Sequence, residues 1–234
     1  MNFSATPVGA QCRRRETSWR AAWLATAIAV TGIQAGHAQL DIFHRAYHPN
    51  NIFAYPPKLP LDFRRLAVLP VAAGSADGIL PDGCADLGPI LFEQLVKTKR
   101  FEVVSVDPDT LRSGTGQRSW TGQETLPAGF LGFVRRQYDC DGVLFAELTC
   151  YHAYAPLAVG WRLKLVDARS GQIIWAADEV FDATEPAVRR AAQHFGNQRL
   201  HMPFVSEDNW QALNSPRQFG RYAITTLLGT LPTR

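Results

Sequence analysis

Residues 39–234 lack an excess of charge of either sign, and this absence excludes one class of partner. The whole chain of 234 residues carries 24 Lys and Arg against 21 Asp and Glu. Four of those arginines but only one acid, Glu16, precede residue 39, so the remainder holds 20 basic and 20 acidic groups. A balanced chain offers no electrostatic basis for binding a phosphate backbone, and we therefore expect no nucleic-acid partner.

Metal-binding patterns are also missing. Cysteine occurs at only four positions, Cys12, Cys84, Cys140 and Cys150. These cysteines form no CxxC pair and join no histidine at the spacing of metal ligands. His44 and His48 lie four residues apart and could share a helix face, but Pro49 follows and no acidic residue is placed as a third ligand. A weak metal-binding pair is one interpretation, and two solvated histidines are the other. We expect no metal and no cofactor.

Catalytic motifs are absent as well. The chain contains no GxSxG elbow, no phosphate-binding loop and no HExxH helix. Residues 114–116 (GTG) lack the third glycine of a dinucleotide-binding loop. We expect a protein that is not an enzyme. The alternative is a hydrolase that uses Glu147 or Asp141 in a cleft, although Glu147 also fits an exposed or interface position on a sheet.

The first 38 residues are predicted to be a secretory signal peptide. Basic residues from Arg13 to Arg20 precede an apolar run of 13 residues at 21–33, and small residues at Gly36 and Ala38 precede Gln39. The run is shorter than the ~20 residues of a transmembrane helix. No cysteine stands at the expected cleavage point for lipid attachment. A twin-arginine signal at Arg14 and Arg15 and an uncleaved amphipathic anchor are the alternatives.

Residues 39–64 combine prolines with aromatic residues, which predicts an extended arm. Because aromatic side chains favour burial, we expect the arm to lie along the body of the domain; a free partner-binding arm is the alternative. Its Tyr47, Phe53 and Tyr55 are candidate contacts with a partner or a membrane. Trp120, in a polar, glycine-rich segment, is a further candidate contact. The alternative is that Trp120 folds back on the domain.

Residues 65–234 are predicted to form a single domain. The continuous apolar residues 66–71 indicate a buried central strand, and residues 101–105 a second strand. Residues 73–83 are rich in Gly and Asp and predict a loop. Apolar spacing predicts helices at residues 87–97 and 127–138, and a short helix that carries Leu111 is expected to begin at Asp107.

The second half of the domain carries a predicted β-hairpin. Residues 142–151 form a third strand, and 159–166 alternate between apolar and basic side chains before a turn at 167–171 and a returning strand at 172–180. Two helices follow, the last with Ser215 as N-cap and Pro216 at its first position. The expected fold class is α/β (α+β), with a mixed sheet of about five strands, flanking helices and extra C-terminal helices.

The three cysteines after residue 38 leave the redox state open. Cys140 and Cys150 flank one predicted strand of ten residues, ~33 Å long, which no disulfide spans. If the strand before Cys150 runs parallel to the first strand, its end lies near Cys84. A Cys84–Cys150 disulfide is therefore the favoured pairing, and three unpaired thiols are the alternative.

Four segments in chain order resemble a known family. They are residues 65–71 (RLAVLPV), 100–105 (RFEVVS), 139–148 (DCDGVLFAEL) and 163–175 (LKLVDARSGQIIW). Together they resemble the periplasmic domain family of the curli secretion component CsgG, the TolB amino-terminal domain and the envelope lipoproteins LpoB and PelC. The resemblance implies an α/β domain with a mixed sheet and an accessory, often oligomeric, role in the bacterial envelope. It supplies no catalytic residue.

The family's pore hairpins are not carried over. Each hairpin needs two alternating strands of ~9–11 residues, and residues 105–129 and 149–161 hold no such pair. We expect an exported, non-enzymatic accessory protein in the periplasm, or at the periplasmic face of the outer membrane, of a Gram-negative-type bacterium. It would bind an envelope protein to assist assembly, secretion or regulation. A membrane-associated homo-oligomeric ring that guides a secreted polymer is the alternative.

Overall fold

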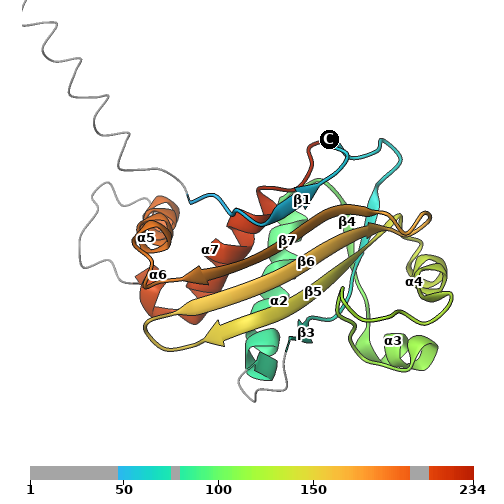
Figure 1. Cartoon of the computed structure of the whole chain (residues 1–234), viewed down its shortest axis with the longest axis horizontal. Helices are drawn as coiled ribbons and strands as arrows, with labels where there is room; N and C mark the ends of the chain where they lie inside the picture. Colours follow the sequence, from blue (N-terminus) through green and yellow to red (C-terminus); the bar gives the residue numbers. More distant parts are fainter. Residues whose placement is uncertain (1–46, 75–79, 201–210) are drawn as a thin grey trace, which may run out of the picture. The chain divides into compact units, whose positions relative to one another are not determined.

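The computed structural model describes residues 47–74, 80–200 and 211–234 (Figure 1). The predicted signal peptide, His44 and the start of the arm lie outside these residues. Within them, no helix is both long and apolar enough to span a bilayer. The unit Ala46–Arg234 contains every strand and both apolar clusters described below, so it has a hydrophobic core of its own.

This unit contains both strands and helices. The strands are β1 (Ile52–Ala54), β2 (Arg65–Val68), β3 (Ala72–Ala73), β4 (Glu102–Ser105), β5 (Gly142–His152), β6 (Ala158–Asp167) and β7 (Ile173–Asp182). The helices are α2 (Leu80–Lys97), α3 (Pro108–Thr115), α4 (Phe130–Tyr138), α5 (Pro186–Leu200), α6 (Gln211–Asn214) and α7 (Pro216–Leu228).

The described strands form one seven-stranded mixed sheet in the order β1-β7-β6-β5-β2-β4, with β3 beside β5. Strands β5, β6 and β7 are antiparallel, whereas β2 is parallel to both β4 and β5. The predicted fold class is confirmed. The two strands beyond the expected five are short: β1 pairs with β7, and β3 resumes the pairing with β5 after Pro70, which has no amide proton to donate.

One face of the sheet packs against helices α2 and α7, which lie behind the strands in Figure 1. Trp161 and Trp175 are fully buried there, together with leucines from α2 and α7. Alternation explains this arrangement, because the apolar residues of β6 and β7 point to one side of the sheet. The larger of the two apolar clusters forms on this side and provides most of the core.

Helix α2 begins earlier than the sequence indicates. Residues 80–83 were expected to belong to a loop, but they form the first turn of the helix. Pro81 is tolerated there because the first helical amides need no partner within the helix. A Cβ atom at Gly83 would lie 2.7 Å from the side chains of Leu148 and Tyr151, so this glycine serves close packing of the helix on the sheet rather than a turn.

Local sequence signals are confirmed at the hairpin and at the starts of two helices. The β6–β7 hairpin turns at Gly171, whose φ of 73° suits glycine. Asp107 accepts a hydrogen bond from the Thr110 amide at the start of α3. Ser215 does the same for Gln218 before α7. These elements depend on neighbouring residues, which is why the sequence predicts them well.

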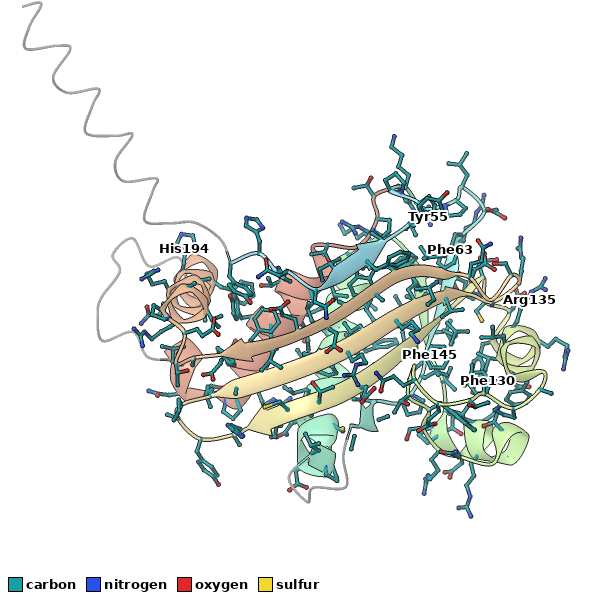
Figure 2. The ribbon with its side chains drawn as sticks, in the orientation of Figure 1. Tyr55, Phe63, Phe130, Arg135, Phe145 and His194 are labelled. Carbon is teal, nitrogen blue, oxygen red and sulfur yellow. The ribbon has the colours of Figure 1, made fainter. Side chains whose placement is uncertain are left out.

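A smaller apolar cluster lies on the opposite face, under α3 and α4. Phe130 of α4 stacks on Phe145 of β5 with ring centroids 5.9 Å apart, and both side chains are labelled in Figure 2. Val134 and Leu111 are fully buried beside them. These two helices cover only the part of this face that adjoins β5 and β2 (Figure 1).

Residues 47–64 lie along the body of the unit. The Tyr47 ring packs edge-on against Phe181, with centroids 5.5 Å apart. Strand β1 extends the sheet beside β7. Leu59 and Phe63 are 5% and 2% exposed, so both belong to the core. The described part of the arm is therefore fastened by strand pairing at one point and by burial at three others.

Candidate functional site

The candidate functional site is the part of the sheet that α3 and α4 leave uncovered. We call it the open face. It contains side chains that alternate with the core residues of β5, β6, β7 and β1, and they are Glu147, Arg162, Lys164, Asp178, Val180 and Phe53. Figure 1 shows the strands from this side, with α2 and α7 behind them. No helix of the described residues covers it.

Three charged side chains form one row across the open face. Glu147, Arg162 and Asp178 are direct cross-strand neighbours on β5, β6 and β7. Arg162 Nη1 donates to Glu147 Oε1 at 2.9 Å, and its Nε donates to Asp178 Oδ2 at 2.8 Å. The hydrogen bond to Asp178, followed by the nearby charge of Glu147, raises the pKa of Arg162 despite partial burial. The strand register thus holds a cation between two carboxylates.

This charged row is only partly solvated. The side chains of Glu147, Arg162 and Asp178 are 5%, 27% and 39% exposed, so the row runs from the interior to the surface. Glu147 Oε2 and Thr149 Oγ1 are buried and have no hydrogen-bond partner among the described residues. The exposed end of the row, at Asp178, is available to a further group.

Two apolar side chains flank the row. Val180 and Phe53 are both 50% exposed. Their cross-strand neighbours are Gly160 and Ala176, which are too small to cover them. Gly160 cannot be larger, because a Cβ atom there would lie 2.5 Å from Thr149 Oγ1. The open face therefore presents two apolar anchors beside a fixed charge pattern, a combination typical of protein-binding surfaces.

The candidate contact residues fall in different places. Phe53 lies on the open face and Tyr55, 69% exposed, follows it. The Tyr47 hydroxyl donates to Glu179 Oε1 at 2.6 Å, and burial together with this hydrogen bond raises the pKa of Tyr47. Tyr47 is half-buried against Phe181, so it contributes to packing more than to any outer surface.

Trp120 requires a correction, because the structure buries it. The ring is 6% exposed, packs edge-on against Phe130 at 5.6 Å and donates from Nε1 to Thr115 Oγ1 at 2.9 Å. The segment around it is held to the sheet, where Gly122 O accepts a hydrogen bond from Lys164 Nζ. A tryptophan with its polar atom satisfied and its ring buried is a core residue, and this segment instead forms one border of the open face.

The cysteines require a second correction. Cys84, Cys140 and Cys150 are all free thiols, so the predicted Cys84–Cys150 disulfide is wrong. Cys84 packs on the core beneath α2, where burial raises its pKa to about 11. Tyr151 points into that same core, so strand alternation turns Cys150 to the other face. The sheet separates the two sulfur atoms.

Asp141, a candidate for catalysis, is placed as a structural acceptor. Its Oδ2 accepts from the amides of Arg64 and Arg65 at 2.9 and 3.1 Å, and its Oδ1 accepts from Arg169 Nη2 at 2.9 Å. Burial opposes ionisation, but these donors outweigh it and lower the pKa of Asp141. The described residues contain no group of three potential metal ligands.

Asp141→Asn is therefore expected to destabilise the fold by about 2 kcal/mol through loss of charge-assisted hydrogen bonds. The folded-state pKa of Asp141 lies below the ordinary aspartate value. Its contribution to folding stability is therefore complete above the ordinary pKa and is lost as the pH falls through the folded-state pKa. Urea unfolding at neutral and acidic pH checks this. The difference from wild type should shrink in acid; a constant difference would contradict the assignment.

Comparison with known proteins gives structural likenesses only. Neither a family model nor a curated protein matches the chain. A PelC dodecamer structure from Paraburkholderia phytofirmans is 15% identical with a TM-score of 0.48, covering 78% of this chain and 96% of that one. Lipoprotein GNA1162 from Neisseria meningitidis is 17% identical with a TM-score of 0.32, covering 60% and 99%.

The C-terminal domain of LpoB from Salmonella enterica is 16% identical with a TM-score of 0.34, covering 54% of this chain and 86% of that one. PelC and LpoB are names from the family that the strand motifs resemble. Identities below 25% and TM-scores below 0.5 assign neither function nor assembly to this chain, so both have to be argued from its own residues.

Alternation alone could have revealed most of the open face. Residues 161–165 place Arg162 and Lys164 opposite the apolar side chains, and this prediction is confirmed. The same period applied to β7 would have placed Asp178 and Val180 beside them. The pairing of Arg162 with both carboxylates depends on strand register, which no single segment contains.

Proposed function

We propose that the protein is an exported accessory protein without catalytic activity, and that it binds another protein of the bacterial envelope through the open face. The predicted signal peptide and the four strand motifs support the compartment and the type of role. The observation that carries the proposal is the charged row flanked by half-exposed apolar side chains, on a sheet surface that no described helix covers.

The energetics of the open face favour a partner. Covering Val180 and Phe53 removes apolar surface from water, which is the main favourable contribution to protein association. The charged row supplies specificity, because a partner has to present a donor or cation to the exposed carboxylate of Asp178. The guanidinium of Arg162 is already hydrogen-bonded to both Glu147 and Asp178, so ordering this side chain on binding costs little conformational entropy.

The test uses two valines with equal exposure. Val180 on the open face is 50% exposed, and Val96 on α2 is 48% exposed. A photo-crosslinking amino acid placed at position 180 of the full chain in the envelope is expected to capture one discrete protein, and the same residue at position 96 is not. Equal capture from both positions would contradict the proposal. A product that contains only this chain would identify the partner as a second copy.

A matched pair of substitutions checks the same surface without a crosslinker. Val180→Asp is expected to reduce co-purification of the captured protein at least ~10-fold, since one buried apolar anchor contributes at least that much to affinity. Val96→Asp should leave it unchanged. Both positions are half-exposed, so both variants should unfold within ~1 kcal/mol of wild type. Robust turnover of any envelope substrate by the purified protein would overturn the non-enzymatic role.

A further inference from the structure

A second exposed surface is formed by the segment between β1 and β2. Residues 55–61 read YPPKLPL, and Lys58 is the only charged residue among them. Leu61 is 94% exposed and Tyr55 is 69% exposed, and Pro57 and Pro60 are exposed too. Figure 1 shows this segment, in blue, beside the C-terminus, and Figure 2 labels Tyr55 within it.

The segment is held in place at several points along its length. The Tyr55 amide donates to Ile174 O at 2.9 Å, and the Leu59 amide donates to Thr233 O at 2.8 Å. The Phe63 amide closes the following turn on Pro60 O at 3.0 Å. Since Leu59 and Phe63 are buried, the exposed residues project from a fixed base. Little conformational entropy would be lost when they bind something.

Exposed cations surround the apolar tip. Lys58, Arg64 and Arg234 are exposed, and none of them takes part in the ion pairs of the described residues. Arg234 Nη2 donates to Phe63 O at 3.1 Å, which places this cation next to the segment. The nearby Asp62 pairs with Arg169 at 3.0 Å, a cation that it shares with Asp141. The surface around the tip therefore favours an anionic partner.

We propose that residues 55–61, together with Lys58, Arg64 and Arg234, dock the protein on the surface of a bilayer that contains anionic lipids. A leucine with 94% of its surface free projects outwards, so a fluid interface can surround it, whereas a flat protein surface covers one side. Tyrosine suits the boundary between headgroups and acyl chains, and cations near it interact with lipid phosphates. The proposal is independent of the open face.

The experiment is co-sedimentation of the unit Ala46–Arg234 with vesicles of phosphatidylethanolamine and phosphatidylglycerol. This unit has its own core, and it omits the apolar run at 21–33, which would partition into vesicles by itself. We expect binding that weakens with added salt and that is much weaker on phosphatidylcholine vesicles. Absence of binding to the anionic vesicles would overturn the proposal.

Matched variants test whether the exposed tip contacts the vesicles. Leu61→Asp should weaken binding at least ~10-fold, because it replaces an inserted apolar side chain by a charge. Tyr55→Ser should also weaken it, whereas Tyr154→Ser, at a tyrosine 88% exposed between β5 and β6, should not. Unchanged binding by Leu61→Asp, with an unchanged melting curve, would overturn docking through the tip. Docking on lipid would also be overturned if Leu61→Asp kept full vesicle binding but abolished crosslinking of the tip to an envelope protein. The tip would then be a protein-binding surface.

Discussion

Arg162→Met is expected to lower the free energy of unfolding by ~3 kcal/mol, measured by urea denaturation. The substitution removes the cation that holds Glu147, whose side chain is 5% exposed, and leaves a buried carboxylate without a charged partner. Glu147 Oε2 already has no hydrogen-bond partner among the described residues. The loss of the bond to Oε1 would therefore leave both oxygens unsatisfied. Methionine keeps most of the volume, so the effect reports the charge rather than a cavity.

The matched control removes both charges. In the double variant Glu147→Met/Arg162→Met, no buried charge is left without a partner, and we expect stability to return to within ~1 kcal/mol of wild type. Asp178 is 39% exposed and can be hydrated without Arg162. A double variant as unstable as Arg162→Met alone would show that the row acts through packing. In that case its charges would have no role in the fold.

The double variant also separates stability from function. If the charged row exists for the fold alone, the double variant should bind the captured envelope partner as well as wild type does. If the row gives specificity to the open face, the double variant folds but binds less well. Buried ion pairs often contribute little net stability relative to apolar replacements. The proposed recognition role of the open face therefore predicts that the double variant loses binding without losing stability.

The parts of the fold that the sequence predicts depend on short-range chemistry. The two-residue alternation in residues 161–165, the helix that begins at Asp107 and the Ser215-Pro216 pair each express a local backbone preference, and all are confirmed. The start of α2 was missed because Gly83 looks like a turn residue until Leu148 and Tyr151 lie against it. Strands β1 and β3 were missed because each is formed by its partner strand, not by its own few residues.

The candidate site shows the same limit. Alternation places Arg162 on a polar face, but only the register of β5, β6 and β7 brings Glu147 and Asp178 to either side of it. Trp120 was weighed as a surface contact because its neighbours in sequence are polar. Its neighbours in space are Phe130 and the Thr115 hydroxyl, which bury the ring and satisfy its nitrogen. Composition around a residue therefore misleads where a loop folds back on the core.

Phe181→Ala is expected to cost about 4 kcal/mol of stability and to lower the melting temperature by ~10 °C. Phe181 is fully buried at the point where several parts of the chain meet. Its ring lies 5.5 Å from Tyr47 of the arm and 5.7 Å from Tyr222 of α7. Tyr222 in turn lies 5.8 Å from Phe195 of α5. The substitution removes the ring that joins the arm and α7 to β7.

The comparison for Phe181→Ala is the same substitution at Phe53, which is 50% exposed on the adjoining strand. Phe53→Ala should change stability by less than ~1 kcal/mol, because water already reaches half of the side chain. Limited proteolysis adds a second readout: loss of the Phe181 ring should make the chain before β1 more susceptible to cleavage, since Tyr47 loses its packing partner. Equal stability of the two alanine variants would contradict the aromatic junction. An unchanged cleavage pattern in Phe181→Ala would show that β1 and the Glu179 hydrogen bonds alone hold the arm.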